Sequence, residues 1–309
     1  MSPYLIRRLF SSAVVIVGVP TLVFCVIRMV PGDPADSIMG DQALVVDKER
    51  FREAHHLDKP LHVQYGLFLR SIFDGSLGRD FENPDVTVAS ILARALPATV
   101  ELALASMAFA LLLAIPLGVI SAVRQYSWVD NGAMLLALVG VSMPNFWLGP
   151  MLLILFSLTL RWLPNPGEEV VGLTDLVLPT ITLGTALLGK LTRMTRAAVL
   201  EVLGEDYVRT ARAKGLSERV VLYKHVMRNA LVPVMTIAGL QFGAVLTGAI
   251  ITEKVFARPG LGTLLLSAIE KRNFEVVQGT VILVAFVYVA VNLATDLAYA
   301  LADPRIRYR

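Results

Sequence analysis

The sequence predicts an all-α membrane protein with six transmembrane helices and with both termini in the cytoplasm. Hydrophobic residues make up 55% of its 309 positions and charged residues only 17%, whereas about 25% of the residues in a soluble globular protein are charged. The mean hydropathy is +0.65. Six runs are apolar for the ~20 residues that a helix needs to cross a bilayer. These observations exclude intrinsic disorder, a disulfide-rich secreted module and most soluble enzymes.

The six apolar runs divide the chain into segments. They are residues 9–30, 97–123, 132–160, 176–199, 230–252 and 276–302. The first run follows two arginines as a signal peptide does, but it is longer than the 7–15 apolar residues of such a peptide. We therefore expect an N-terminal anchor helix (1–30), an extracytoplasmic insert (31–93), a transmembrane domain (94–302) and a cytoplasmic tail (303–309).

The distribution of Lys and Arg predicts the orientation. Cations precede the first span, follow the second, fill the segment before the fifth and end the chain, at Arg7, Arg8, Arg124, 193–228, Arg305, Arg307 and Arg309. These segments alternate along the chain, so they fall on one side of the membrane, which the positive-inside rule identifies as the cytoplasm. The intervening segments 32–96 and 165–175 carry more acidic residues, among them Glu168 and Glu169.

The insert is expected to fold locally. A turn at 31–34 precedes two amphipathic pieces near 48–57 and 61–73. The single cysteine, Cys25, lies in the first apolar run, so no intrachain disulfide and no cysteine metal cluster can form.

Catalytic and cofactor motifs are incomplete. Residues 184–190 match the first seven positions of a phosphate-binding loop, but the eighth is Leu191 instead of Ser or Thr. The four histidines form no metal-binding pair, and no G-x-S-x-G elbow is present. We expect no catalytic residues, no metal and no nucleic-acid partner; a membrane-embedded hydrolase stays a distant alternative. Gly239 and Gly243 form a G-x-x-x-G face, which serves either another chain or packing within this one.

The cytoplasmic loop 201–229 carries the functional signal. Asp206 is expected to cap a short helix over 207–214, Gly215 to end it in a left-handed turn, and Ser217 to cap a second helix that runs into the fifth span. Two stiff helices meeting at a glycine can enter a groove on another protein. The alternative is a basic loop on anionic lipid, which would need neither the glycine nor the caps.

This loop resembles the coupling loop, or EAA loop, of the permease subunits of ATP-binding-cassette importers. The matching letters are GEDYVRTARAKGL at 204–216 and HVMRNALVP at 225–233. The general loop begins Glu-Ala-Ala, where this chain has Arg209, Thr210 and Ala211, and it has Leu-Pro where this chain has Met227 and Arg228. Peptide-type permeases commonly make both replacements.

Further matches extend the resemblance over nearly the whole chain. They are RRL at 7–9, VPGDPA at 30–35, LDKPL at 57–61, GSLG at 75–78, MTR at 194–196, EVL at 201–203, EKVF at 253–256, PGLG at 259–262 and DPRIR at 303–307. The chain is similar to the first-permease type of the dipeptide/oligopeptide (peptide/nickel/glutathione) importer family.

The resemblance implies a type I importer transmembrane domain in the bacterial cytoplasmic (inner) membrane. It implies a second homologous permease as heterodimer partner, two ATPase subunits that hold the ATP and Mg, and an extracytoplasmic substrate-binding protein. This chain would then be a transport subunit without a cofactor, importing short peptides such as dipeptides, oligopeptides or glutathione. Nickel chelates or another small solute are the alternative cargo.

Two sets of residues follow as site predictions, while the substrate ligands are unknown. The loop expected to dock on an ATPase comprises Glu205, Asp206, Tyr207, Arg209, Thr210, Ala211, Arg212, Ala213, Lys214, Gly215 and Leu216. The external gate and docking surface for the binding protein is expected at Phe256, Pro259, Gly260, Leu261 and Gly262.

Overall fold

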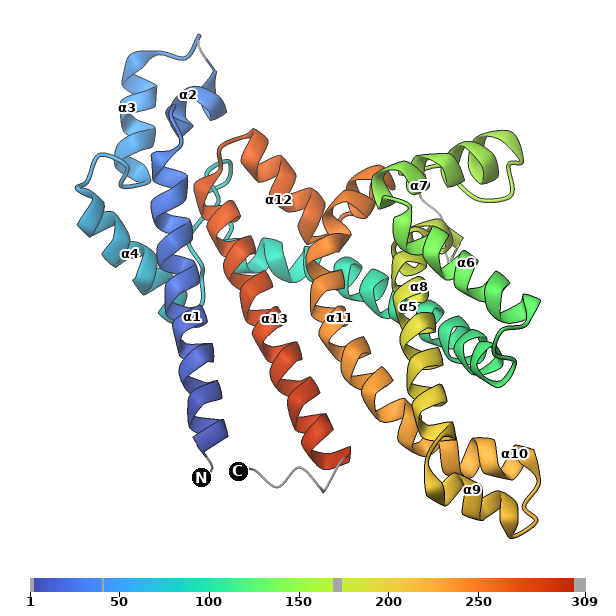
Figure 1. Ribbon diagram of the computed structural model, residues 1–309. Coiled ribbons are helices and arrows are strands. Elements are labelled where there is room, and N and C mark those ends of the chain that lie inside the picture. Colours follow the sequence, from blue (N-terminus) through green and yellow to red (C-terminus); the bar gives the residue numbers. More distant parts are fainter. Residues whose placement is uncertain (1–2, 41, 169–173, 303–309) are drawn as a thin grey trace. The chain divides into compact units, whose positions relative to one another are not determined.

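The computed structural model describes residues 3–40, 42–168 and 174–302, and it is helical (Figure 1). The helices are α1 (Pro3–Met29), α2 (Pro34–Met39), α3 (Val45–Ala54), α4 (Leu61–Phe73), α5 (Val88–Val123), α6 (Trp128–Ser142), α7 (Asn145–Leu152), α8 (Thr174–Leu203), α9 (Asp206–Ala213), α10 (Glu218–Val220), α11 (Met227–Val255), α12 (Leu261–Glu270) and α13 (Phe274–Ala302). Two π-helical stretches, η1 (Leu153–Thr159) and η2 (Val221–Val226), continue α7 and lead into α11. Within these residues no strand forms, and an isolated bridge pairs Arg79 with Thr87.

The described helices include three that are long and apolar enough to cross a membrane, and a fourth span if one bent pair is counted. The three cover Val88–Val123, Glu218–Leu246 and Phe274–Thr295, and the bent pair is α6 with the helix Asn145–Thr159. A shorter apolar helix covers Val15–Met29. The all-helical class is therefore confirmed, whereas the count of six spans stays a prediction. The basic tail 303–309 and Glu169 lie outside the described residues.

The expected third span, 132–160, is not one straight helix. Its two halves meet at 100°, at the break between Ser142 and Asn145. Met143 has an extended backbone, with ψ 119°, because the ring of Pro144 disfavours helical geometry in the residue before it. The prediction of a single continuous run was wrong here, and Pro144 is the signal that it overlooked.

The chain forms two compact units. The first contains the chain up to Thr99 together with Pro259–Val289, and the second contains Val100–Arg258 together with the part of α13 that begins at Ala290. The units are described separately below.

The first unit contains the small helices of the insert. α4 begins and ends where the amphipathic pattern predicted, and its Phe68 packs with Phe24 of α1 and Ile282 of α13. A second apolar cluster joins the start of α5 to α12 and α13, through Val88, Leu92, Ala95, Leu261, Ala268, Val276 and Val277.

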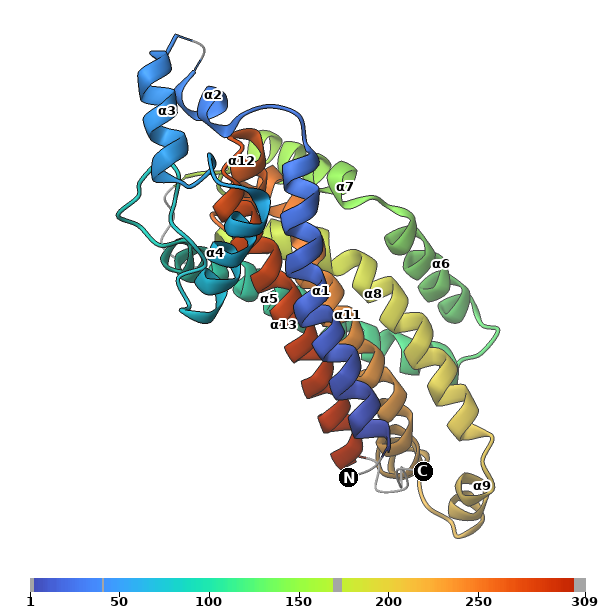
Figure 2. The same cartoon turned by 90° about the vertical axis from the view of Figure 1, so that its left-hand side faces the viewer.

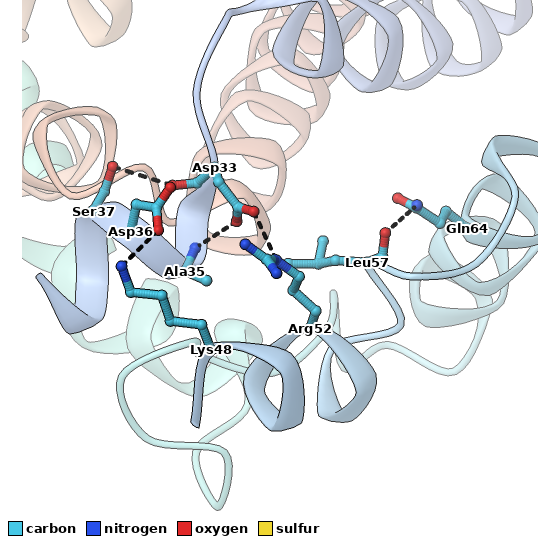
Figure 3. A network of polar contacts seen from close by, with 8 residues as sticks. All are labelled: Asp33, Ala35, Asp36, Ser37, Lys48, Arg52, Leu57 and Gln64. Carbon is cyan, nitrogen blue, oxygen red and sulfur yellow. Dashed lines mark hydrogen bonds and ion pairs between the residues drawn. The ribbon is translucent and has the colours of Figure 1, made fainter. Parts of the chain in front are cut away.

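A polar network orders the start of the insert (Figure 3). The carboxylate of Asp33 accepts a 2.8 Å hydrogen bond from the backbone N–H of Ala35 and so caps α2. The same carboxylate forms a 2.7 Å ion pair with Arg52, and Lys48 lies 2.8 Å from Asp36. The two ion pairs fasten α2 to α3, which the predicted turn at 31–34 did not reveal.

The second unit is built around α8, which runs beside α6 (Figure 1, Figure 2). A β-carbon on Gly189 of α8 would overlap the carbonyl oxygen of Ala137 on α6. A β-carbon on Gly118 of α5 would likewise overlap Thr195 of α8. Glycine therefore allows both α5 and α6 to approach α8 at backbone distance.

Candidate functional site

The short helix of the candidate coupling loop starts one residue earlier than expected. α9 spans Asp206–Ala213, and Glu205 is its N-cap residue, with extended backbone angles but no capping bond from its side chain. Asp206 therefore lies in the first turn, where a carboxylate still interacts favourably with the helix dipole. The prediction that Asp206 is the cap was wrong by one position: Asp is the preferred N-cap residue of the two, but here it lies in the first turn and Glu205 occupies the cap position.

Gly215 ends this segment in the left-handed conformation, as predicted. Its φ is +77°, and no atom lies within 4 Å of the position of a β-carbon. The N–H of Gly215 donates to the carbonyl of Arg212 at 2.9 Å, and the N–H of Leu216 donates to the carbonyl of Ala211 at 3.4 Å. This arrangement is that of a glycine-terminated helix. The glycine is therefore required for its backbone angles and not for space.

The second helix of the corner is continuous with the fifth expected span. Ser217 occupies the N-cap position of α10, as predicted, although its side chain makes no capping bond. From Glu218 the helix continues through η2 into α11. The guanidinium of Arg212 donates to both carboxylate oxygens of Glu218, at 2.8 and 3.2 Å, across Gly215. This pairing of α9 with α10 was not predicted, although Arg212 and Glu218 are only six positions apart in the sequence, on opposite sides of the glycine turn.

One face of α9 holds the loop on the protein. Val208 is fully buried and Ala211 is 5% exposed. They belong to a cluster that also contains Ala122 of α5, Ala198 and Val199 of α8, Val221 and Val226 of η2, and Met227, Ala230 and Val234 of α11. Tyr207 adds a polar attachment, because the side-chain amide of Asn229 donates to its hydroxyl at 2.7 Å. Val208 and Asn229 were missed as part of the site; Val208 and Ala211 lie three apart, which is the spacing of a buried helical face.

The opposite face of α9 and the turn are open. Among the predicted coupling residues Ala211 is buried and the others are exposed: Glu205, Asp206, Tyr207, Arg209, Thr210, Arg212, Ala213, Lys214, Gly215 and Leu216. Tyr207 and Leu216 are each 39% exposed, which places apolar surface among charged groups. One face of α9 is packed on the protein, and its exposed face combines charged groups with apolar surface. This combination suits a segment that binds another protein.

The predicted external gate divides between the two units. In the second unit Phe256 is buried at the end of α11. Arg258, two positions later, is 7% exposed. Its guanidinium forms ion pairs with Asp175 of α8 at 2.7 Å and with Glu101 of α5 at 2.9 Å. The ion pairs of Arg258, which sequence reasoning missed, fasten the end of α11 to two other helices.

In the first unit the remaining gate residues begin α12. Gly260 is the N-cap residue, and the N–H of Leu261 donates to the hydroxyl of Thr99 at 2.8 Å. Leu261 and Gly262 are buried, while Pro259 is exposed. Most of the predicted gate residues are thus packed inside their own unit, and Pro259 is the one that presents surface.

The predicted packing glycines lie on α11. A β-carbon on Gly239 would overlap Thr295 of α13, so Gly239 serves packing within this chain. Gly243 is buried. Beside Gly239 the second unit contains a largely apolar cavity of about 590 Å³, which extends along α11 from Arg228 to Phe242. Among the described residues no group of three His, Cys, Asp or Glu side chains is placed to hold a metal ion.

Comparison with known proteins identifies relatives of the whole chain. The family described as "Binding-protein-dependent transport system inner membrane component" matches residues 114–308, and the model of its N-terminal region matches residues 1–103. A di/tripeptide transport system permease protein of Pseudomonas aeruginosa is 42% identical, and a glutathione transport system permease protein of Pectobacterium atrosepticum is 41% identical; each alignment covers 100% of both chains. The solved inward-facing MetNI methionine ABC transporter has a similar fold, with a TM-score of 0.53 at 18% identity over 69% of this chain and 96% of that chain.

Proposed function

This chain belongs to the family of binding-protein-dependent transport system inner membrane components, and we propose that it is the permease subunit of an ATP-driven importer of short peptides. It is a multi-pass protein of the inner membrane. The observation that carries the proposal is the exposed corner α9–Gly215–α10, which packs against the other helices of the second unit through Val208 and Ala211. The full-length relatives are named for di/tripeptides and for glutathione, which supports short peptides as the cargo.

In this proposal the chain crosses the membrane six times with both termini in the cytoplasm. The segments 1–30, 94–302 and 303–309 then serve as anchor, transmembrane domain and tail, and the insert 31–93 lies outside. This topology places loop 201–229, with its excess of Lys and Arg, on the cytoplasmic side. The partners are a second homologous permease in a heterodimer, two ATPase subunits that bind ATP and Mg, and an extracytoplasmic binding protein.

The transport mechanism that we propose begins at α9. The exposed face of α9, from Tyr207 to Leu216, docks in a cleft of an ATPase subunit. When nucleotide closes the ATPase pair, the corner moves with it, and the two permeases rock between inward-open and outward-open states. No bond is made or broken in this chain, so its contribution is to transmit movement and to form the pathway.

We propose that the end of α11 and the start of α12 receive the binding protein and form part of the external gate. Pro259 is exposed there. Phe256 is buried in the second unit, and the first unit buries Gly260, Leu261 and Gly262. Deletion of 257–262 should abolish peptide delivery from the binding protein while leaving basal ATP hydrolysis intact. Unchanged delivery by the deletion variant would refute this assignment.

The test of the function is reconstitution. The chain is purified with its co-purifying partners, placed in proteoliposomes, and supplied with ATP inside the vesicles and with a labelled dipeptide, tripeptide or glutathione on the binding-protein side. We expect uptake that requires both the binding protein and ATP. Purification of the chain without any ATPase, under conditions that retain the subunits of another ABC importer, would refute the proposal.

A further inference from the structure

We infer that Asp130 and Arg196 are positioning residues for transport: their partly buried ion pair locks the α5–α6 turn to α8, so that movement delivered to α9 reaches α5, α6 and α8 as one body. The inference rests on the proposed function, because it assigns the path by which the coupling corner acts.

Asp130 has every acceptor position of its carboxylate engaged. It is 2% exposed, in the first turn of α6. The guanidinium of Arg196 donates to both of its oxygens, each at 2.7 Å. The hydroxyl of Ser121 and the backbone N–H of Tyr126, the latter at 2.9 Å, also donate to it. The carboxylate thus joins α5, the α5–α6 turn, α6 and α8.

An ion pair with this geometry holds one arrangement of the helices. The two parallel N–H···O bonds of an Arg–carboxylate fork fix direction as well as distance. Apolar contacts allow one helix to slide along another, whereas sliding α8 would leave the buried charge of Asp130 without its cationic partner, which is strongly unfavourable. The first turn of α6 also favours a negative charge through the helix dipole. The pair is therefore suited to fixing register.

The same three helices make contacts that leave little room for relative movement. Gly118 of α5 faces Thr195, which is next to Arg196 on α8. Between α6 and α8, a β-carbon added at Gly140 would lie against the backbone of Thr185, and one added at Gly189 would lie against the backbone of Ala137. These contacts make the helices fit, and the ion pair fixes them at the end nearest the coupling loop.

Helix α9 packs directly on the helices that the ion pair joins. Ala122 follows Ser121, whose hydroxyl binds Asp130, and it packs in the same cluster as Val208 and Ala211 of α9. On α8, Ala198 and Val199 belong to that cluster and lie within one turn of Arg196. A push on α9 is therefore applied to α5 and α8 within a few residues of the ion pair.

The test measures ATP hydrolysed per peptide imported by the assembled complex in proteoliposomes. In Asp130→Asn the charge is lost but the shape is kept, and in Arg196→Lys the charge is kept but the fork is lost. Each should raise the ratio of ATP to peptide, with Asp130→Asn raising it by at least about fivefold, the lower end of a typical coupling between sites. Asp175→Asn is the matched control, because it removes an Arg–carboxylate pair from the other end of α8, ~32 Å away along the helix. The control should keep the ratio of the wild type.

A covalent rescue separates transmission from folding. In a Cys25→Ala background, Asp130→Cys with Arg196→Cys removes the ion pair, and a short bis-methanethiosulfonate reagent then links the two helices again. We expect the link to restore the wild-type ratio, and the reagent to have no effect on the Asp130→Cys single variant. This comparison also decides the case in which Asp130→Asn fails to assemble.

Three results would overturn the inference: a wild-type ratio in assembled Asp130→Asn, an equal rise in Asp175→Asn, or no effect of the cross-link on the double-cysteine protein. Failure of the proposed function looks different, because the wild-type complex would then show no ATP hydrolysis stimulated by the binding protein. That result would overturn the proposed function and this inference with it.

Discussion

Replacement of Gly215 by valine should separate ATP hydrolysis from peptide uptake. Gly215 has φ +77°, and no atom lies within 4 Å of its Cβ position. The added β-carbon therefore meets no neighbour, and we expect the cost to arise from the backbone angles. For a non-glycine residue the left-handed conformation costs about 1–2 kcal/mol, which corresponds to a factor of about 5–30 in the population of the native turn.

The turn fixes the angle between α9 and α10, because Arg212 reaches Glu218 across it. We expect Gly215→Val to lower peptide uptake by a similar factor of about 5–30, while the ATPase subunits retain basal hydrolysis. The readout is the ratio of ATP hydrolysed to labelled peptide imported, measured in proteoliposomes at equal amounts of assembled complex.

Two variants check the reasoning. Gly215→Asn should keep most of the coupling, since Asn tolerates the left-handed region better than other non-glycine residues. Gly204→Ala adds a methyl group in the same loop, at a glycine without positive φ. The methyl carbon would lie 3.4 Å from the carbonyl oxygen of Glu201, and the variant should behave as the wild type. Full, coupled transport by Gly215→Val would show that the corner does not transmit movement.

Three further predictions concern the insert and the helix packing. Burial lowers the pKa of His55, so the folded insert binds fewer protons than the unfolded chain and loses stability as the pH falls below about 6.5; limited proteolysis of α3 should be faster at pH 5.5 than at pH 7.5, and His55→Gln should remove the difference. Asp33→Ala removes a cap and an ion pair and should destabilise α2 by about 0.5–2 kcal/mol, seen as faster hydrogen exchange in α2 but not in α4. Gly189→Ala should cost about 1–3 kcal/mol through overlap with α6 and lower the Tm, whereas Gly132→Ala, with no atom within 4 Å, should not; equal Tm values would contradict the packing argument.

Local signals in the sequence predicted those features that depend on local physics. The limits of α4 follow from its amphipathic period, and the left-handed Gly215 follows from its place after a helix-forming stretch. The start of α9 departs from local rules, because Asp is preferred to Glu at an N-cap, yet Glu205 occupies that position and Asp206 lies in the first turn. The buried face formed by Val208 and Ala211 fits the observed helix.

Contacts between residues far apart in the sequence were not predictable in this way. Asp130 and Arg196 are separated by 66 positions, and nothing in the spacing of charges along one chain pairs them. The pairing depends on the approach of α6 to α8, which in turn depends on where glycine replaces a side chain in the contact. The ion pair of Arg258 with Asp175, 83 positions apart, is of the same kind. Single-sequence reasoning therefore located the corner and the helices on which it rests, but not the contacts that join those helices.

The two attachments of α9 differ in helix geometry, and we expect this difference to affect how a movement of α9 is passed on. Toward α8 the chain meets a helix that the Asp130–Arg196 ion pair joins to α6 and that packs closely on α6 at Gly189. Toward α11 it passes through the π-helical η2, whose wider turns are typical of functional sites. A displaced α9 should therefore carry α8, α5 and α6 with it as a unit, while η2 takes up the change of angle before α11. On the inference above, the ion pair keeps α8, α5 and α6 together, and η2 is where we expect the angle between the corner and α11 to change.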